Sequence, residues 1–65
     1  MDRKAIGQRL LMLRGEESRA VVADAIGVSI SALQMYENGE RVPRDEIKVK
    51  LANYYNQTVR SIFYN

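Results

Sequence analysis

The sequence contains neither cysteine nor histidine. Without cysteine no disulfide can form, and because zinc sites are built largely from cysteine and histidine, we expect no zinc site. The most common general acid and base of enzymes, histidine, is also missing. These absences argue against a disulfide-rich secreted mini-protein and against a metal-stabilised fold, and we expect neither a metal nor a cofactor.

Long apolar runs are missing as well. No run approaches the roughly 18 residues that a membrane span requires. The opening segment MDRKAIGQRL lacks the apolar core of a signal peptide. We therefore expect no membrane association and a cytoplasmic location.

The chain has 65 residues, which predicts a single domain over residues 1–65. A chain of this size buries only about 60% of the surface that it exposes when unfolded. Its stability should therefore be marginal, and dimerisation would add to it. The hydrophobic content of 46% and the charged content of 28% are ordinary for a globular helical domain.

The formal net charge of +2 permits nucleic-acid binding without establishing it. What matters is whether basic side chains gather on one surface. Arginines recur through the first two-thirds of the chain, interleaved with acidic residues, and their alternative role as solvated charges on helix faces stays open. The arginines are Arg9, Arg14, Arg19, Arg41 and Arg44.

Helical spacing of apolar residues and helix-ending residues divides the chain into five segments. Ile6, Leu10 and Leu13 share one face of a helix predicted over about residues 2–14. Ser18 and Ser29 are positioned to cap the second and third helices. The further apolar residues predicted to face the core are Val22, Ala23, Ile26, Val28, Leu33, Tyr36, Ile47, Leu51, Tyr55 and Ile62.

Turn residues set the ends of these helices. Gly27 and Asn38-Gly39 are predicted to stop the second and third, and Asn56 the fourth. Pro43 suits the first position of the fourth helix, and Thr58 caps a final turn. No segment alternates long enough for a strand, so the predicted fold class is all-α, with five short helices at sharp angles.

Three residues in the second helix, the following turn and the third helix have a characteristic spacing. Ala23 is small enough for two helices to cross closely, Gly27 can turn the chain, and Leu33 can fill the wedge between the helices. This pattern is typical of a helix-turn-helix. Two ordinary core helices would be the alternative.

The sequence resembles the Cro/C1-type (Xre) helix-turn-helix family, to which lambda-type phage repressors belong. The matching stretches are IGQRLLMLR, then SRAVVADAIGVSISALQMYENGERVPRDEIKVKLANYY, then TVRSIF, with YENGERVP the most specific. The resemblance implies a lambda-repressor-like domain that binds double-stranded DNA as a small transcriptional regulator, a repressor by expectation. It also implies a homodimer on a partly palindromic operator.

The chain departs from the family pattern at three places. The link Gly15–Glu17 is about two residues shorter than is common in the family, so the second helix must start close to the first. Arg19 replaces a frequent glutamine, which keeps a donor for phosphate and adds charge. Residues 58–61 lack the acids usual in the final turn.

The third helix, about Ser29–Asn38, is expected to lie in the major groove. By resemblance its base-reading positions are Ile30, Ser31 and Met35, with Gln34 beside them. Gln34 suits adenine and Ser31 can donate or accept, whereas the two apolar residues suit a thymine methyl.

Phosphate contacts are expected from four side chains that fix the position of the protein on DNA without reading sequence. Arg19 stands at the amino end of the second helix, where the helix dipole favours an anion. By resemblance Asn38 and Arg44 touch the backbone, and Arg41 is a further candidate. The resemblance also pairs Glu37 with Arg14 as a structural ion pair.

Other functions have less support in the sequence. No Gly-rich phosphate loop and no convergent nucleophile and base are present, so we expect no enzyme and no small-molecule ligand. The main alternative is a protein-binding helical module, such as an antitoxin or a phage-type accessory factor. Apolar residues expected at the surface favour it, and a homodimer through Phe63 and Tyr64 is compatible with both functions. The apolar residues expected at the surface are Ile30, Met35, Phe63 and Tyr64.

Overall fold

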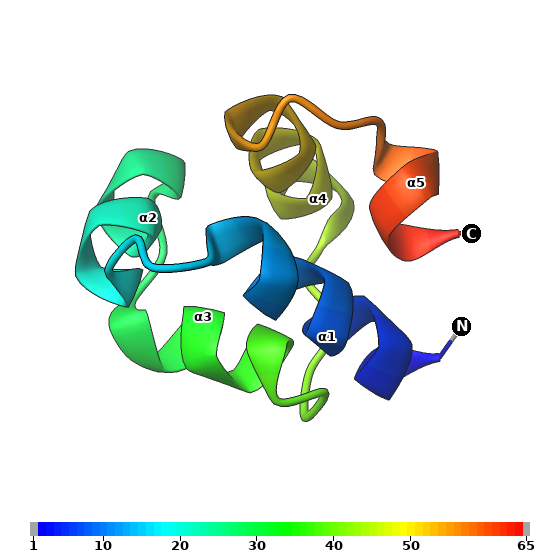
Figure 1. Ribbon diagram of the computed structural model, residues 1–65, viewed down its shortest axis with the longest axis horizontal. Helices are drawn as coiled ribbons and strands as arrows, with labels where there is room; N and C mark the ends of the chain where they lie inside the picture. Colours follow the sequence, from blue (N-terminus) through cyan, green and yellow to red (C-terminus); the bar gives the residue numbers. More distant parts are fainter. Residues whose placement is uncertain (1, 65) are drawn as a thin grey trace.

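The computed structural model describes residues 2–64, and within that range it contains five helices and no strand (Figure 1). In chain order they are α1 Arg3–Arg14, α2 Arg19–Ile26, α3 Ile30–Glu37, α4 Asp45–Tyr54 and α5 Val59–Phe63. The predicted all-α architecture is confirmed.

Most of these helices begin at a side chain that caps the first turn. The first N–H groups of a helix have no partner within it, and a side-chain oxygen just before the helix can accept from one of them. The capping residues are Asp2 for α1, Ser18 for α2, Ser29 for α3 and Thr58 for α5. The caps predicted at Ser18, Ser29 and Thr58 are confirmed.

The predicted helix ends are also confirmed. Gly27, Gly39 and Asn56 have φ angles of 76°, 75° and 56°, in the left-handed region that turns the chain out of a helix. Asn56 is the one residue other than glycine between residues 2 and 64 with a positive φ.

The start of the fourth helix was predicted wrongly. Pro43 is not its first residue: the helix begins at Asp45, and Arg44 is the residue before it, with an extended ψ of 161°. Residues 41–44 lie outside the helices as they cross from α3 to α4, and the Pro43 side chain is buried along this crossing. The acidic residues Asp45 and Glu46 occupy the first turn of α4, as expected.

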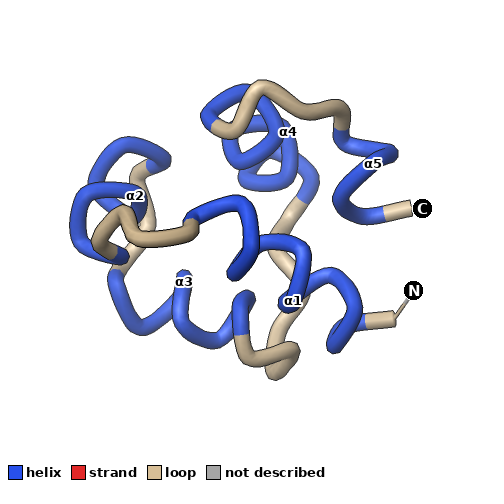
Figure 2. Tube along the Cα trace, in the orientation of Figure 1, coloured by secondary structure: helices blue, strands red, loops and turns tan. Residues whose placement is uncertain are grey.

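The helices surround one apolar core. α1 packs against α3 and α5, α2 packs against α3 and α4, and α4 packs against α5, so each helix contacts two others (Figure 2). Leu13, Val28 and Tyr55 are partly buried rather than central. The buried apolar residues are Ile6, Leu10, Val22, Ala23, Ile26, Leu33, Tyr36, Ile47, Leu51, Ala52, Ile62 and Phe63.

α1 and α3 approach so closely that one position of α1 must be glycine. A Cβ added at Gly7 would lie 2.4 Å from the carbonyl oxygen of Glu37 and 2.9 Å from that of Tyr36. Both atoms belong to the backbone and cannot swing aside. The absence of a side chain at Gly7 thus allows α1 to lie directly against the carboxyl end of α3.

We expect Gly7→Ala to destabilise the fold by about 1–3 kcal/mol, because the added methyl group overpacks this contact. Helix propensity alone predicts the opposite sign, since alanine favours a helix over glycine by about 1 kcal/mol. Urea denaturation measures the free energy of unfolding. Ala25→Gly at an exposed site of α2 is the control, for which only the propensity cost of about 1 kcal/mol is expected. A Gly7→Ala variant as stable as the native chain would contradict the close approach.

Candidate nucleic-acid interface

α2 and α3 are joined by a tight turn at Gly27. The Gly27 N–H donates to the Asp24 carbonyl at 3.3 Å, and the Val28 N–H donates to the Ala23 carbonyl at 3.0 Å. Ala23 is 1% exposed. A larger side chain at this position would push the packed helices apart. The structure therefore has the small residue, the turn and the wedge residue Leu33 of a helix-turn-helix.

α3 has two faces with different surroundings. Leu33, Tyr36 and Glu37 are buried against the rest of the protein. The predicted base-reading residues lie elsewhere on the helix: Ile30 is 51% exposed, Ser31 and Gln34 are exposed, and Met35 is half-buried. Ile30 and Gln34 are four residues apart, so they lie on the same side of the helix, one turn from each other.

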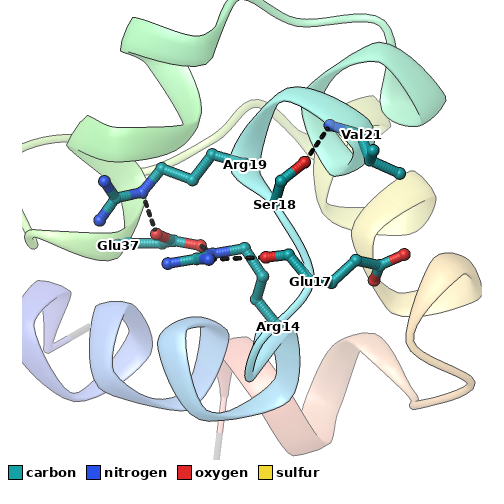
Figure 3. Close-up of polar contacts among 6 residues, drawn as sticks. All are labelled: Arg14, Glu17, Ser18, Arg19, Val21 and Glu37. Carbon is teal, nitrogen blue, oxygen red and sulfur yellow. Dashed lines mark hydrogen bonds and ion pairs between the residues drawn. The ribbon is translucent and has the colours of Figure 1, made fainter.

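A buried carboxylate at the end of α3 connects three parts of the fold. The Glu37 side chain has no solvent exposure, and each of its oxygens accepts from a different arginine (Figure 3). Arg14 Nε donates to Oε2 at 2.8 Å, and Arg19 Nε donates to Oε1 at 2.7 Å. The structure thus brings together the end of α1, the start of α2 and the end of α3.

Arg14 also holds the short link between α1 and α2. Its Nη1 donates to the Glu17 carbonyl at 2.7 Å, and the Glu17 carboxylate accepts from the Tyr54 hydroxyl of α4. The hydrogen bond with Glu37 raises the pKa of the Arg14 guanidinium above its ordinary value, so Arg14 stays charged. The link Gly15–Glu17 is therefore held by a hydrogen bond from Arg14 to its backbone and by a hydrogen bond from α4 to the Glu17 side chain.

Arg19 has a contact that sequence reasoning missed. It was predicted only as a phosphate contact, yet its Nε is bonded to Glu37. The sequence holds only an indirect signal: arginine stands where glutamine is frequent in the family, and a buried carboxylate needs hydrogen bonds to both of its oxygens. The Arg19 side chain is still 32% exposed. The bond to Glu37 and a contact with phosphate are thus compatible.

The other predicted phosphate contacts lie at the surface near the end of α3 and the start of α4. Asn38 follows α3, and its Nδ2 donates to Glu40 Oε2 at 3.2 Å. Arg44 Nη2 lies 3.1 Å from Glu46 Oε1, but both side chains are well exposed, at 78% and 65%. Such a pair contributes little and is readily exchanged. Arg41 is exposed. All three side chains are thus accessible to a ligand.

The Tyr55 hydroxyl is buried and has no hydrogen-bond partner within residues 2–64. Burial, with the charge of the Glu37 carboxylate as a smaller cause, raises the pKa of Tyr55 to about 12. Tyr55 therefore remains neutral at physiological pH and acts here as a largely apolar side chain.

The carboxyl end differs from expectation. Phe63, predicted as part of an exposed dimer surface, is 2% exposed and belongs to the core, and Lys48 Nζ of α4 lies 5.7 Å from the centre of its ring. Tyr64 is 55% exposed, and its hydroxyl accepts from the buried Lys48 Nζ at 2.8 Å. This hydrogen bond raises the pKa of Lys48, which also lies 4.9 Å from the centre of the Tyr64 ring. Phe63 therefore cannot serve as a docking residue.

Residues 2–64 lack two further features. No group of three or more acidic, histidine or cysteine side chains in that range could hold a metal ion. No helix in the same range is long and apolar enough to cross a membrane.

The turn at Gly27, the packed residues Ala23 and Leu33 and the exposed side of α3 together define a helix-turn-helix domain of the DNA-binding class. A family model described as Helix-turn-helix matches residues 18–62, which is more than half of the chain. The protein belongs to this Cro/C1-type helix-turn-helix family. A search of curated proteins gave no match. Family membership identifies the chain as a DNA-binding regulator in general terms.

Proposed function

We propose that the protein binds a specific double-stranded DNA sequence with α3 in the major groove and represses transcription there. The observation that carries this proposal is the division of α3 into a face fixed by Leu33, Tyr36 and Glu37 and a face that is open to solvent. A helix that reads base edges has to be held rigidly from behind while its outer side chains remain free. The family supplies the ligand class, DNA.

Four side chains of α3 read the bases in this proposal. Gln34 bonds an adenine through its amide, and Ser31 donates to or accepts from a neighbouring base. Ile30, half exposed at the start of α3, packs against a thymine methyl group, and Met35 adds apolar contact beside it. The reading face has few hydrogen-bonding groups, so DNA shape contributes to the choice of sequence.

Phosphate contacts come from Arg19, Asn38, Arg41 and Arg44 in this proposal. They lie at the start of α2 and along the segment that follows α3, on either side of the reading helix in the chain. Contacts of this kind set the position of the protein on the duplex and supply most of its salt-dependent affinity.

We further propose that two copies bind a partly palindromic operator. A twofold-symmetric pair of reading helices would meet half-sites about one helical turn of DNA apart, roughly 34–36 Å. Of the two carboxyl-terminal residues considered for the dimer contact, only Tyr64 is at the surface.

Selection of binding sites from random duplexes at low salt tests the proposed function. We expect one enriched sequence with inverted-repeat symmetry. The logarithm of its affinity should fall by about 0.9 for each phosphate contact per log unit of salt. A failure to enrich any sequence would contradict the proposal and would favour a protein partner for the same apolar residues of α3.

We expect Ile30 to contact a thymine methyl group in the selected site, so that this methyl group contributes to affinity. Replacing the contacted thymine by deoxyuridine removes one methyl group, for which we expect about a fourfold loss of affinity, equivalent to about 0.8 kcal/mol. Ile30→Ala should bind the thymine and deoxyuridine duplexes almost equally, as measured by fluorescence anisotropy. Val49→Ala, an exposed apolar residue of α4, is the matched control and should keep the native preference. If Ile30→Ala retained the full preference, Ile30 would not read that base.

A further inference from the structure

The two arginines bound to Glu37 use their donors differently. Arg14 bonds Glu37 through Nε and the Glu17 carbonyl through Nη1, and its side chain is only 14% exposed. Arg19 bonds Glu37 through Nε alone and is 32% exposed. Within residues 2–64 its two terminal nitrogens have no hydrogen-bond partner. Arg19 therefore keeps its terminal donors available while one edge of its guanidinium is held.

The bond at Nε fixes the orientation of the whole Arg19 guanidinium. A guanidinium is planar and its donors form a rigid fork, so the bond from Nε to Glu37 Oε1 sets the plane in which the terminal nitrogens lie. Glu37 is itself immobilised, because it is fully buried and bonded to Arg14 on its other oxygen. Figure 3 shows Arg19 extending from the start of α2 to this carboxylate. The side-chain entropy that a free surface arginine would lose on binding is thus largely lost already in the folded protein.

We propose that Glu37 is a positioning residue for DNA binding, which holds Arg19 so that its terminal nitrogens meet a backbone phosphate at the amino end of α2. This inference rests on the proposed function. Arginine suits this role because its planar group presents separate, rigidly connected edges to the carboxylate and the phosphate, whereas the three donors of a lysine radiate from one freely rotating ammonium and hold no fixed plane.

Charge alone predicts a different effect of Glu37→Gln on DNA affinity than positioning does. Arg14, Arg19 and Glu37 together carry a net charge of +1, so neutralising Glu37 raises the local charge to +2. A purely Coulombic effect would therefore make Glu37→Gln bind DNA more tightly. Positioning predicts the opposite sign, because Arg19 loses the acceptor that orients it.

The first test compares Arg19→Lys with Arg19→Gln on the selected duplex. Lysine keeps the charge and leaves the Arg14–Glu37 pair in place, so the variant should fold. We expect both variants to lose about tenfold in affinity. Arg19→Gln, which also removes the charge, should in addition lower the salt slope by about 0.9, the value for one phosphate contact. Arg60→Lys in α5 is the matched control and should keep the native affinity and slope. Native affinity in Arg19→Lys would overturn the inference.

The second test places Glu37→Gln in the native and Arg19→Gln backgrounds, at a temperature where circular dichroism shows both proteins folded. We expect about a tenfold loss of affinity in the native background and little further loss in the Arg19→Gln background. Tighter binding, or an equal loss in both backgrounds, would overturn the inference. If Glu37→Gln does not fold, the Arg19→Lys result decides. A native chain that binds no duplex would overturn the proposed function itself, and this inference with it.

Discussion

The carboxylate of Glu37 is the constraint on which the arrangement of α1, α2 and α3 depends. A charge with no solvent exposure is costly unless it is paired and hydrogen-bonded. Both of its oxygens are satisfied, one by Arg14 at the end of α1 and one by Arg19 at the start of α2. The carboxylate thereby fixes where three separate elements meet. Removing it would leave two arginines unpaired beside the core.

The backbones of α1 and the end of α3 also approach closely in this region. Gly7 lies against the carbonyl groups at the end of α3, and a Cβ added at Gly39 would come within 3.0 Å of the Lys4 Cα in α1. α3 is therefore held by backbone contact, by core packing through Leu33 and by the ion pairs of Glu37. These three contacts leave its Ile30 and Gln34 side open to solvent. Anchoring and recognition thus use different faces of one helix of eight residues.

The sequence was sufficient where local chemistry decides the structure. Caps at Ser18, Ser29 and Thr58 and turns at Gly27, Gly39 and Asn56 follow from hydrogen bonding and backbone sterics within a few residues. The errors occurred where distant elements decide. Pro43 suits a first turn locally, but it is buried outside the helix, on the crossing between α3 and α4, and Phe63 is buried in the apolar core. The bond from Arg19 to Glu37 joins residues 18 positions apart, which no local pattern specifies.

NMR observation of the arginine Nε–Hε groups tests the central role of Glu37 most directly. In the native protein we expect the Hε signals of Arg14 and Arg19 both to exchange slowly with water, because each donates to a carboxylate without solvent exposure. In Glu37→Gln both signals should exchange much faster. Slow exchange at Arg14 alone, with Arg19 exchanging like a free surface arginine, would contradict the account of a carboxylate shared by two helices.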